Sequence, residues 1–282
     1  EGSIGRAQPK LDRLHKLYLD DIESVRVGLG KPNAAAPAGF GLKPDELTDE
    51  KLDELAARVE SAYKNLKITL SLEESANDCD YYIESMAEIP EDKHVFYRNL
   101  NEVLEDKTIV MTNSSTLLPS TFKVDFTKPE RYLALHFANN IWRSNSAEVM
   151  GHDGTSQAAY DEAVEFAKAL HMVPIKVLKE QPGYLLNSML VPFLNSAQYL
   201  LANGIGDHEN IDMAWKIGTG APYGPFQILD IVGLTTAYNI VANHPEANDP
   251  TTNAGKIAAM LKKYIDAGKT GVNAGEGFYK YR

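Results

Sequence analysis

The chain has 282 residues, 44% of them hydrophobic and 24% charged, with a formal net charge of −11 at pH 7. It can bury a sizeable core and has room for two domains. The acidic excess argues against nucleic acid or an anionic membrane surface as the partner. No apolar run approaches the roughly 20 residues of a membrane helix, and no signal-peptide pattern opens the chain, so a cytoplasmic location is expected. Because Cys79 is the single cysteine, an intrachain disulfide is excluded, and no Cys or His cluster has metal-site spacing.

The first 65 residues predict two helices joined by a long loop. Apolar residues recur at three- and four-residue spacing after Pro9, which suits the first position of a helix. Residues 28–45 are dense in glycine, proline and alanine, which favours an exposed connection. Thr48 is the expected N-cap of a second amphipathic helix that ends at Asn65.

Strand and helix patterns then alternate. Helices are predicted from Pro90 and over residues 155–171, and strands over residues 67–70, 81–86, 109–111, 132–137, 147–150 and 173–178. This alternation indicates a mainly parallel sheet. The three central runs end in small or polar groups, as parallel strands do where their carboxyl ends open onto a ligand crevice. The strand ends are therefore the expected place for chemistry.

Beyond residue 183 the period-two pattern stops, and the second domain is predicted to be all-helical. We place the boundary at 179–183, which gives domains of residues 1–179 and 180–282. Pro192 should kink or break the first helix of this part. The helices cover 184–203, 211–217, 226–231, 236–243 and 253–267, with Gly204, Gly218, Gly233 and Gly268 as stops. Because residues 185–201 are strongly apolar, a homodimer contact is expected there.

One pair of residues could carry catalysis. His136 ends an apolar run, and Glu148 stands at the start of the next. A carboxylate that holds one imidazole nitrogen fixes the tautomer, so that the other nitrogen can act as a general base. On spacing alone, the more common arrangement is a buried histidine bonded to a backbone carbonyl and a glutamate on the solvent side.

A dinucleotide-binding fold opens with a strand, a G-x-G-x-x-G turn and a helix, so that the pyrophosphate meets backbone N–H groups. The candidates in this chain are residues 2–5 and Gly28-Leu29-Gly30, which has Asn33 where the third glycine should be. Neither follows a strand pattern, and both are interpreted as loop residues.

Five separated motifs occur in order along almost the whole chain, and together they resemble the signatures of the L-3-hydroxyacyl-CoA dehydrogenase family. They are Asn113-Ser114-Ser115, His136 to Asn139 with Glu148, Pro182 to Asn187, Gly224-Pro225-Phe226 with Asp230, and Gly275 to Tyr281. The resemblance implies an incomplete Rossmann-type α/β domain with a helical hairpin at 9–65, followed by an all-α substrate and dimerisation domain. In the family, the opening strand, glycine turn and helix would precede Glu1, so residues 1–282 are expected to bind NAD feebly.

The resemblance also implies roles for individual residues. His136 would be the general base with Glu148 as its partner, and Ser115 and Asn187 would bind the substrate. By residue type alone, Ser115 could instead cap a strand end and Asn187 could bond to backbone. Glu88, Lys93 and Asn113 match positions near the NAD cofactor, although Glu88 and Lys93 alone would pass for a surface pair and Asn113 for a chain turn.

The implied activity is reversible hydride transfer between NAD and C3 of an acyl-CoA thioester, the 3-hydroxyacyl-CoA, as in fatty acid metabolism. Two departures from the family bear on the substrate. Ala138 and residues 139–140 replace a second Phe and an Asn-Pro, which makes the pocket wall smaller and more polar, and Ser188 replaces an Arg. The alternatives left open are a dehydrogenase of a free hydroxy acid or sugar acid, and a non-catalytic dimerising fragment.

Overall fold

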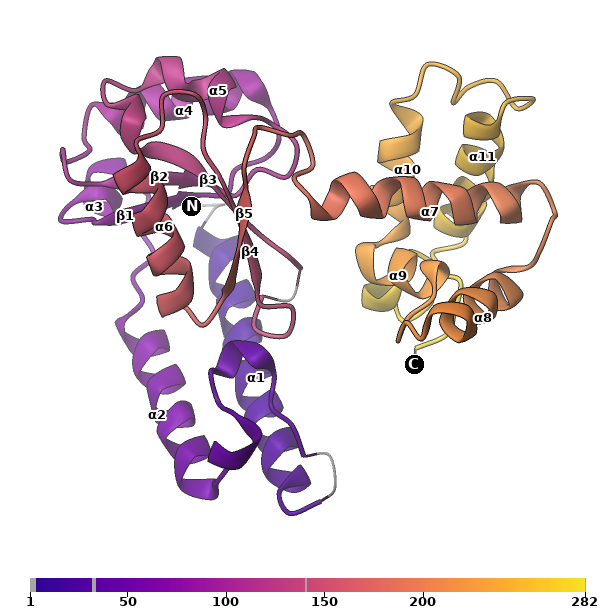
Figure 1. Ribbon diagram of the computed structural model, residues 1–282, viewed down its shortest axis with the longest axis horizontal. Coiled ribbons are helices and arrows are strands. Elements are labelled where there is room, and N and C mark those ends of the chain that lie inside the picture. The colour runs from indigo at the N-terminus through magenta and orange to yellow at the C-terminus, as the bar shows by residue number, and fades with distance from the viewer. Residues whose placement is uncertain (1–3, 32–33, 140, 282) are drawn as a thin grey trace. The chain divides into compact units, whose positions relative to one another are not determined.

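The computed structural model describes residues 4–31, 34–139 and 141–281 (Figure 1). The chain divides into two compact units, Glu1–Leu185 and Leu186–Arg282, and each is described by itself. In the part of the chain that is described, no helix is both long and apolar enough to cross a membrane.

The first unit begins with the expected helical hairpin, formed by α1 (Ile4–Gly28) and α2 (Asp49–Asn65). Thr48 caps α2 as predicted, because its hydroxyl accepts from the Lys51 N–H at 3.3 Å. The prediction that Pro9 starts the first helix is wrong: Pro9 lies inside α1. Proline keeps a helical φ, so the helix continues through it at the cost of one backbone hydrogen bond. A buried cluster of Ile22, Val25, Phe40, Leu52 and Leu55 holds the hairpin and its connection together.

The connection between the hairpin helices is mostly irregular, as expected, with short 3-10 turns at Ala38–Phe40 and Pro44–Glu46. The hairpin is also tied to the loop that carries Trp142 and Arg143. The Asp21 carboxylate accepts from Trp142 Nε1 at 2.8 Å and from Arg143 Nε at 2.9 Å. The Trp142 ring packs against Tyr18 of α1, with ring centroids 5.1 Å apart.

A five-stranded sheet forms the centre of the first unit, in the order β1-β2-β3-β4-β5. Its strands are β1 (Tyr81–Glu84), β2 (Ile109–Thr112), β3 (Tyr132–Phe137), β4 (Ser146–Met150) and β5 (Val173–Val177). All neighbouring strands are parallel except β3 and β4, which are antiparallel. The predicted α/β class with a mainly parallel sheet is confirmed. The expectation that β3 and β4 run parallel is wrong, because the short connection between them leaves no room for a crossover helix.

Helices cover both faces of this sheet. Alternate residues of β2 point to opposite sides: Ile109 and Met111 pack with α6 (Gln157–Ala169), and Val110 packs with α4 (Pro90–Asn101) and α5 (Pro119–Phe122). Pro90 opens α4 as predicted. The helix predicted from residue 155 starts at Gln157 instead, because the Ser156 hydroxyl caps it by accepting from the Ala159 N–H at 3.1 Å.

The strand predicted at residues 67–70 is not formed. These residues are irregular and lead into the short helix α3 (Leu72–Ala76), which Ser71 caps. Leu66 and Leu70 are 51% and 63% exposed. A short segment with apolar residues on both faces forms a strand only where a neighbouring strand pairs with it. Among the described residues no strand pairs with 67–70.

The second unit is all-helical, as predicted. Its helices are α7 (Leu186–Ala202), α8 (His208–Thr219), α9 (Pro225–Val232), α10 (Leu234–Ala242) and α11 (Asn253–Asp266). Gly218 was expected to stop a helix but lies inside α8. This helix ends at Thr219 because the next residue, Gly220, takes the left-handed conformation, with φ of 75°. Pro192 lies within the continuous helix α7.

The buried carboxylate of Asp230 helps to hold the carboxyl-terminal segment. Asp230 of α9 is 1% exposed and accepts from the backbone N–H groups of Phe278 and Tyr279 at 2.8 and 2.9 Å. A Cβ atom at Gly277 would overlap Asp230 Oδ1. This close approach explains why glycine is required in the final motif.

Candidate active site

His136 and Glu148 form a buried pair in the sheet. They are register partners across β3 and β4, and the distance from His136 Nδ1 to Glu148 Oε2 is 3.0 Å. Their residue exposures are 6% and 3%. A carboxylate only accepts hydrogen bonds, so Nδ1 carries the proton of the neutral ring and Nε2 keeps its lone pair. The solvent-side interpretation of Glu148 is therefore wrong, because β4 turns its side chain inward onto the imidazole.

Ser115 completes the group on the other side of the ring. Its Oγ lies 3.2 Å from His136 Nε2, the nitrogen that is free to accept a proton. Glu148 is fixed through its second oxygen, because Oε1 accepts from the Leu185 N–H at 2.9 Å. The first unit thus brings together three of the predicted site residues, with both imidazole nitrogens and both carboxylate oxygens engaged.

Glu88 and Asn113 shape the loop that presents Ser115. The Glu88 carboxylate accepts from Ser114 Oγ at 2.7 Å and from the Ser115 N–H at 3.0 Å. Asn113 Oδ1 accepts from the Phe137 N–H at 3.0 Å, which ties the end of β2 to the end of β3. Both residues therefore lie at the carboxyl ends of the parallel strands, where the ligand crevice was expected.

Lys93 is not part of a surface pair. Its ammonium bonds to Glu84 Oε1 at 2.6 Å, and both side chains have 0% exposure. Glu84, the last residue of β1, also accepts from Thr112 Oγ1 at 2.8 Å, from the Tyr97 hydroxyl and from the Met86 N–H. Burial opposes ionisation of Glu84, but these donors outweigh it and hold the pKa of Glu84 below its ordinary value. The network anchors the start of the loop that carries Glu88.

Sequence reasoning missed Tyr184. Its ring lies flat against the His136 imidazole, with centroids 4.4 Å apart and an interplanar angle of 9°. The only sequence signal was its place in the Pro-Gly-Tyr turn that follows β5. Asn187 belongs to the second unit, where it lies in the first turn of α7 and is half-buried. Among the described residues no group of three or more His, Cys, Asp or Glu could hold a metal ion.

A mainly parallel sheet, a separate helical unit and a histidine held by a carboxylate at a strand end are typical of a two-domain NAD-dependent dehydrogenase. The comparison with known families agrees: residues 43–181 match the 3-hydroxyacyl-CoA dehydrogenase NAD binding domain, and residues 183–281 match the C-terminal domain of the same enzymes. The chain belongs to the 3-hydroxyacyl-CoA dehydrogenase family.

Individual relatives show the same similarity. The chain is 31% identical over 285 residues to a probable 3-hydroxyacyl-CoA dehydrogenase of Caenorhabditis elegans, and the aligned region covers 100% of this chain and 90% of the relative. It is 32% identical to human mitochondrial hydroxyacyl-coenzyme A dehydrogenase over 238 residues, or 84% of this chain and 72% of the relative. The solved structure of a diketoreductase that acts on dicarbonyl compounds is 40% identical, with a TM-score of 0.79 over 99% of this chain and 87% of that one.

The site fits the reacting end of the family cofactor, NAD. Glu88, Asn113 and Ser115 gather polar atoms at the carboxyl ends of β1 and β2, beside His136. No strand followed by a glycine turn and a helix is present in the ranges that the structure describes: Gly5 lies within α1, and Gly28 ends it. The interpretation of Gly5 and Gly28 as loop residues is thus wrong, whereas Gly30 does lie in a turn, with φ of 74°. Gly2, Ser3 and Asn33 fall outside the described residues.

Proposed function

We propose that the protein interconverts L-3-hydroxyacyl-CoA and 3-ketoacyl-CoA by hydride transfer to and from NAD, with His136 as the general base. The observation that carries the proposal is the position of the His136 imidazole between Glu148 at 3.0 Å and Ser115 at 3.2 Å. A base needs an accepting nitrogen beside the substrate and a carboxylate behind it, and this arrangement supplies both.

The proton chemistry follows from the tautomer. Nε2 takes the proton of the substrate hydroxyl as the hydride leaves C3, and the Nδ1–H bond to Glu148 stabilises the imidazolium that forms. The Ser115 hydroxyl can turn from Nε2 and donate to the substrate oxygen, and Asn187 is proposed as a second donor. NAD, when bound, supplies the acceptor of the hydride. In the reducing direction, the imidazolium returns its proton to the forming hydroxyl.

The experiment for this function is a substrate panel with the purified protein. Acetoacetyl-CoA and NADH should give steady oxidation of NADH and L-3-hydroxybutyryl-CoA as the product, and His136→Gln should slow both on the order of 10²- to 10⁴-fold. A protein that binds acetoacetyl-CoA but gives no turnover at any NADH concentration would contradict the proposal and favour a non-catalytic binding role.

A second candidate function is suggested by the diketoreductase relative at 40% identity. Ala138 and Asn139 follow His136 in this chain, and a smaller, more polar wall suits a free dicarbonyl or hydroxy acid better than a long acyl chain. The same panel should therefore include a dicarbonyl compound without coenzyme A and free 3-hydroxybutyrate. A kcat/KM for a free substrate that exceeds the value for acetoacetyl-CoA would make this the main activity.

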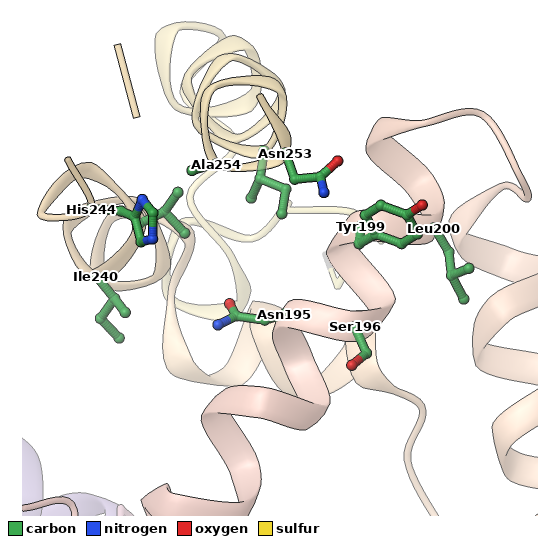
Figure 2. A pocket seen from close by; sticks show the side chains of 10 residues that line it. Asn195, Ser196, Tyr199, Leu200, Ile240, His244, Asn253 and Ala254 are labelled. Atoms are coloured by element: carbon green, nitrogen blue, oxygen red, sulfur yellow. The ribbon is translucent and has the colours of Figure 1, made fainter. Parts of the chain in front are cut away.

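We also propose that the protein is a homodimer through its helical second unit. A groove with a volume of about 520 Å³ opens between α7, α10 and α11, and Figure 2 shows Tyr199 and Ile240 on its two sides. These two side chains are 40% and 46% exposed. Exposed apolar surface of this kind is typical of an interface, and a second copy of the chain is the proposed occupant.

Analytical sedimentation tests whether a second copy of the chain occupies the groove. Ile240→Glu should dissociate the dimer, and Ile217→Glu, on the 77% exposed side chain of α8 outside the groove, should not. Leu190 is a poorer probe because it packs against the core of its own unit. A wild-type protein that sediments as a folded monomer would rule out the dimer.

A cytoplasmic location and the absence of nucleic acid or membrane partners stay proposals.

A further inference from the structure

Tyr184 covers one face of the catalytic imidazole. The two rings are almost parallel, at 9°, and their centroids are 4.4 Å apart. Tyr184 is 1% exposed, so the phenol is a fully packed part of the first unit. Groups from separate elements thus surround His136: Glu148 from β4, Ser115 from the loop after β2 and Tyr184 from the turn after β5.

The backbone at Tyr184 is held in an uncommon conformation. Its φ is 53°, in the left-handed region that bulky residues rarely adopt. Residues held in such regions often mark functional sites, because the surrounding structure must hold them there. Here the Tyr184 hydroxyl donates to the Ser114 carbonyl at 2.7 Å, and the next N–H, that of Leu185, donates to Glu148 at 2.9 Å. One turn therefore contacts His136, Glu148 and Ser114, the residue that precedes Ser115.

We propose that Tyr184 is a positioning residue for hydride transfer: it holds the His136 ring in the plane in which Nδ1 faces Glu148 and Nε2 faces the substrate side. The last torsion of a histidine side chain is soft, so hydrogen bonds at its two nitrogens leave the ring free to tilt unless one face is packed. The face of a phenol also stabilises the imidazolium that forms when His136 takes the proton. This role rests on the proposed function of His136.

The test compares Tyr184→Phe, which keeps the stacked ring, with Tyr184→Leu, which removes it. Tyr184→Leu should lower kcat by roughly 10- to 100-fold, the range for a catalytic group displaced by up to about 1 Å, while KM changes little. Tyr184→Phe should retain kcat within about fivefold, the worth of one hydrogen bond. The matched control is Tyr132→Leu. Tyr132 is a buried tyrosine stacked on Phe126 at 4.5 Å, and its loss should lower stability without changing kcat.

NMR of the protein without cofactor provides a readout that does not depend on activity. The carbon-bound ring protons of His136, assigned by their loss in His136→Gln, should be shifted upfield by the stacked ring in the wild type and in Tyr184→Phe. They should move back in Tyr184→Leu or, if that variant does not fold, in Tyr184→Met. A wild-type spectrum without this shift, or a folded Tyr184→Leu with normal kcat, would overturn the inference. If His136→Gln itself keeps normal turnover, the proposed function fails, whatever the result at Tyr184.

Discussion

His136 and Glu148 stand opposite each other across the antiparallel strands β3 and β4, with 3.0 Å between Nδ1 and Oε2. Because register partners in a sheet share one face, this pairing requires no long-range adjustment of loops. The reversal of chain direction at β4 is what brings the two side chains together. The sheet itself therefore sets the tautomer of the proposed base.

The first prediction concerns the Glu148 carboxylate. Glu148→Gln offers only one oxygen to the two donors that it now binds, His136 Nδ1–H and the Leu185 N–H. It also removes the charge that stabilises the imidazolium. We expect turnover to fall by a factor on the order of 10² to 10⁴ with little loss of secondary structure by circular dichroism. Turnover within about threefold of wild type would show that the carboxylate charge plays no part in proton transfer.

The second prediction concerns the buried Glu84–Lys93 pair. Lys93→Met leaves a carboxylate with 0% exposure without its cation, so the free energy of unfolding should fall by about 3–5 kcal/mol. The double variant Glu84→Gln/Lys93→Met removes both charges and should recover part of that loss. Calorimetry measures both. A single variant as stable as the wild type would contradict the pairing.

Much of the fold was predictable because it depends on local patterns. The buried strands β2 and β3 and the five helices of the second unit were read from apolar spacing and end signals. Features that depend on contacts between distant residues could not be predicted from the sequence. The spacing of His136 and Glu148 gave no sign that β4 is antiparallel, and nothing near Lys93 indicated burial against β1. Tyr184 was missed because its stacking on His136 depends on its own left-handed backbone conformation, which the sequence does not indicate.

The third prediction concerns the tie between the hairpin and the loop that carries Trp142 and Arg143. Partial burial raises the pKa of Asp21, but hydrogen bonds from Arg143 and Trp142 outweigh that effect and hold the pKa below its ordinary value. A depressed pKa contributes stability above the unfolded value of about 3.9, and this contribution is lost as the pH falls through the folded value. Asp21→Asn should therefore destabilise the protein by about 1 kcal/mol at pH 7, after allowance for the exposed Arg143.

Measurement at two pH values tests this sign. Chemical unfolding at pH 7 and near pH 3 should show the difference between wild type and Asp21→Asn shrinking at the lower pH. A difference that grows on acidification would contradict the assigned direction.

The fourth prediction uses two glycines with opposite surroundings. A side chain at Gly277 would overlap Asp230, so Gly277→Ala should destabilise the second unit and release the carboxyl-terminal segment. Gly218→Ala is the matched control. It lies inside α8, and apart from its chain neighbours and the backbone of its own helix no atom lies within 4 Å of the added Cβ. Gly218→Ala should therefore stabilise the protein by roughly 0.5–1 kcal/mol. Equal melting temperatures for the two variants would refute the predicted contrast between the two positions.

The central claim is that His136 transfers the substrate proton, and the kinetics of His136→Gln test it most directly. The glutamine can still hydrogen-bond but cannot accept a proton at neutral pH, so kcat should fall on the order of 10²- to 10⁴-fold while KM for the 3-ketoacyl-CoA changes little. Unfolding by heat should match the wild type to within a few degrees. A folded His136→Gln protein with near-normal kcat would contradict the account.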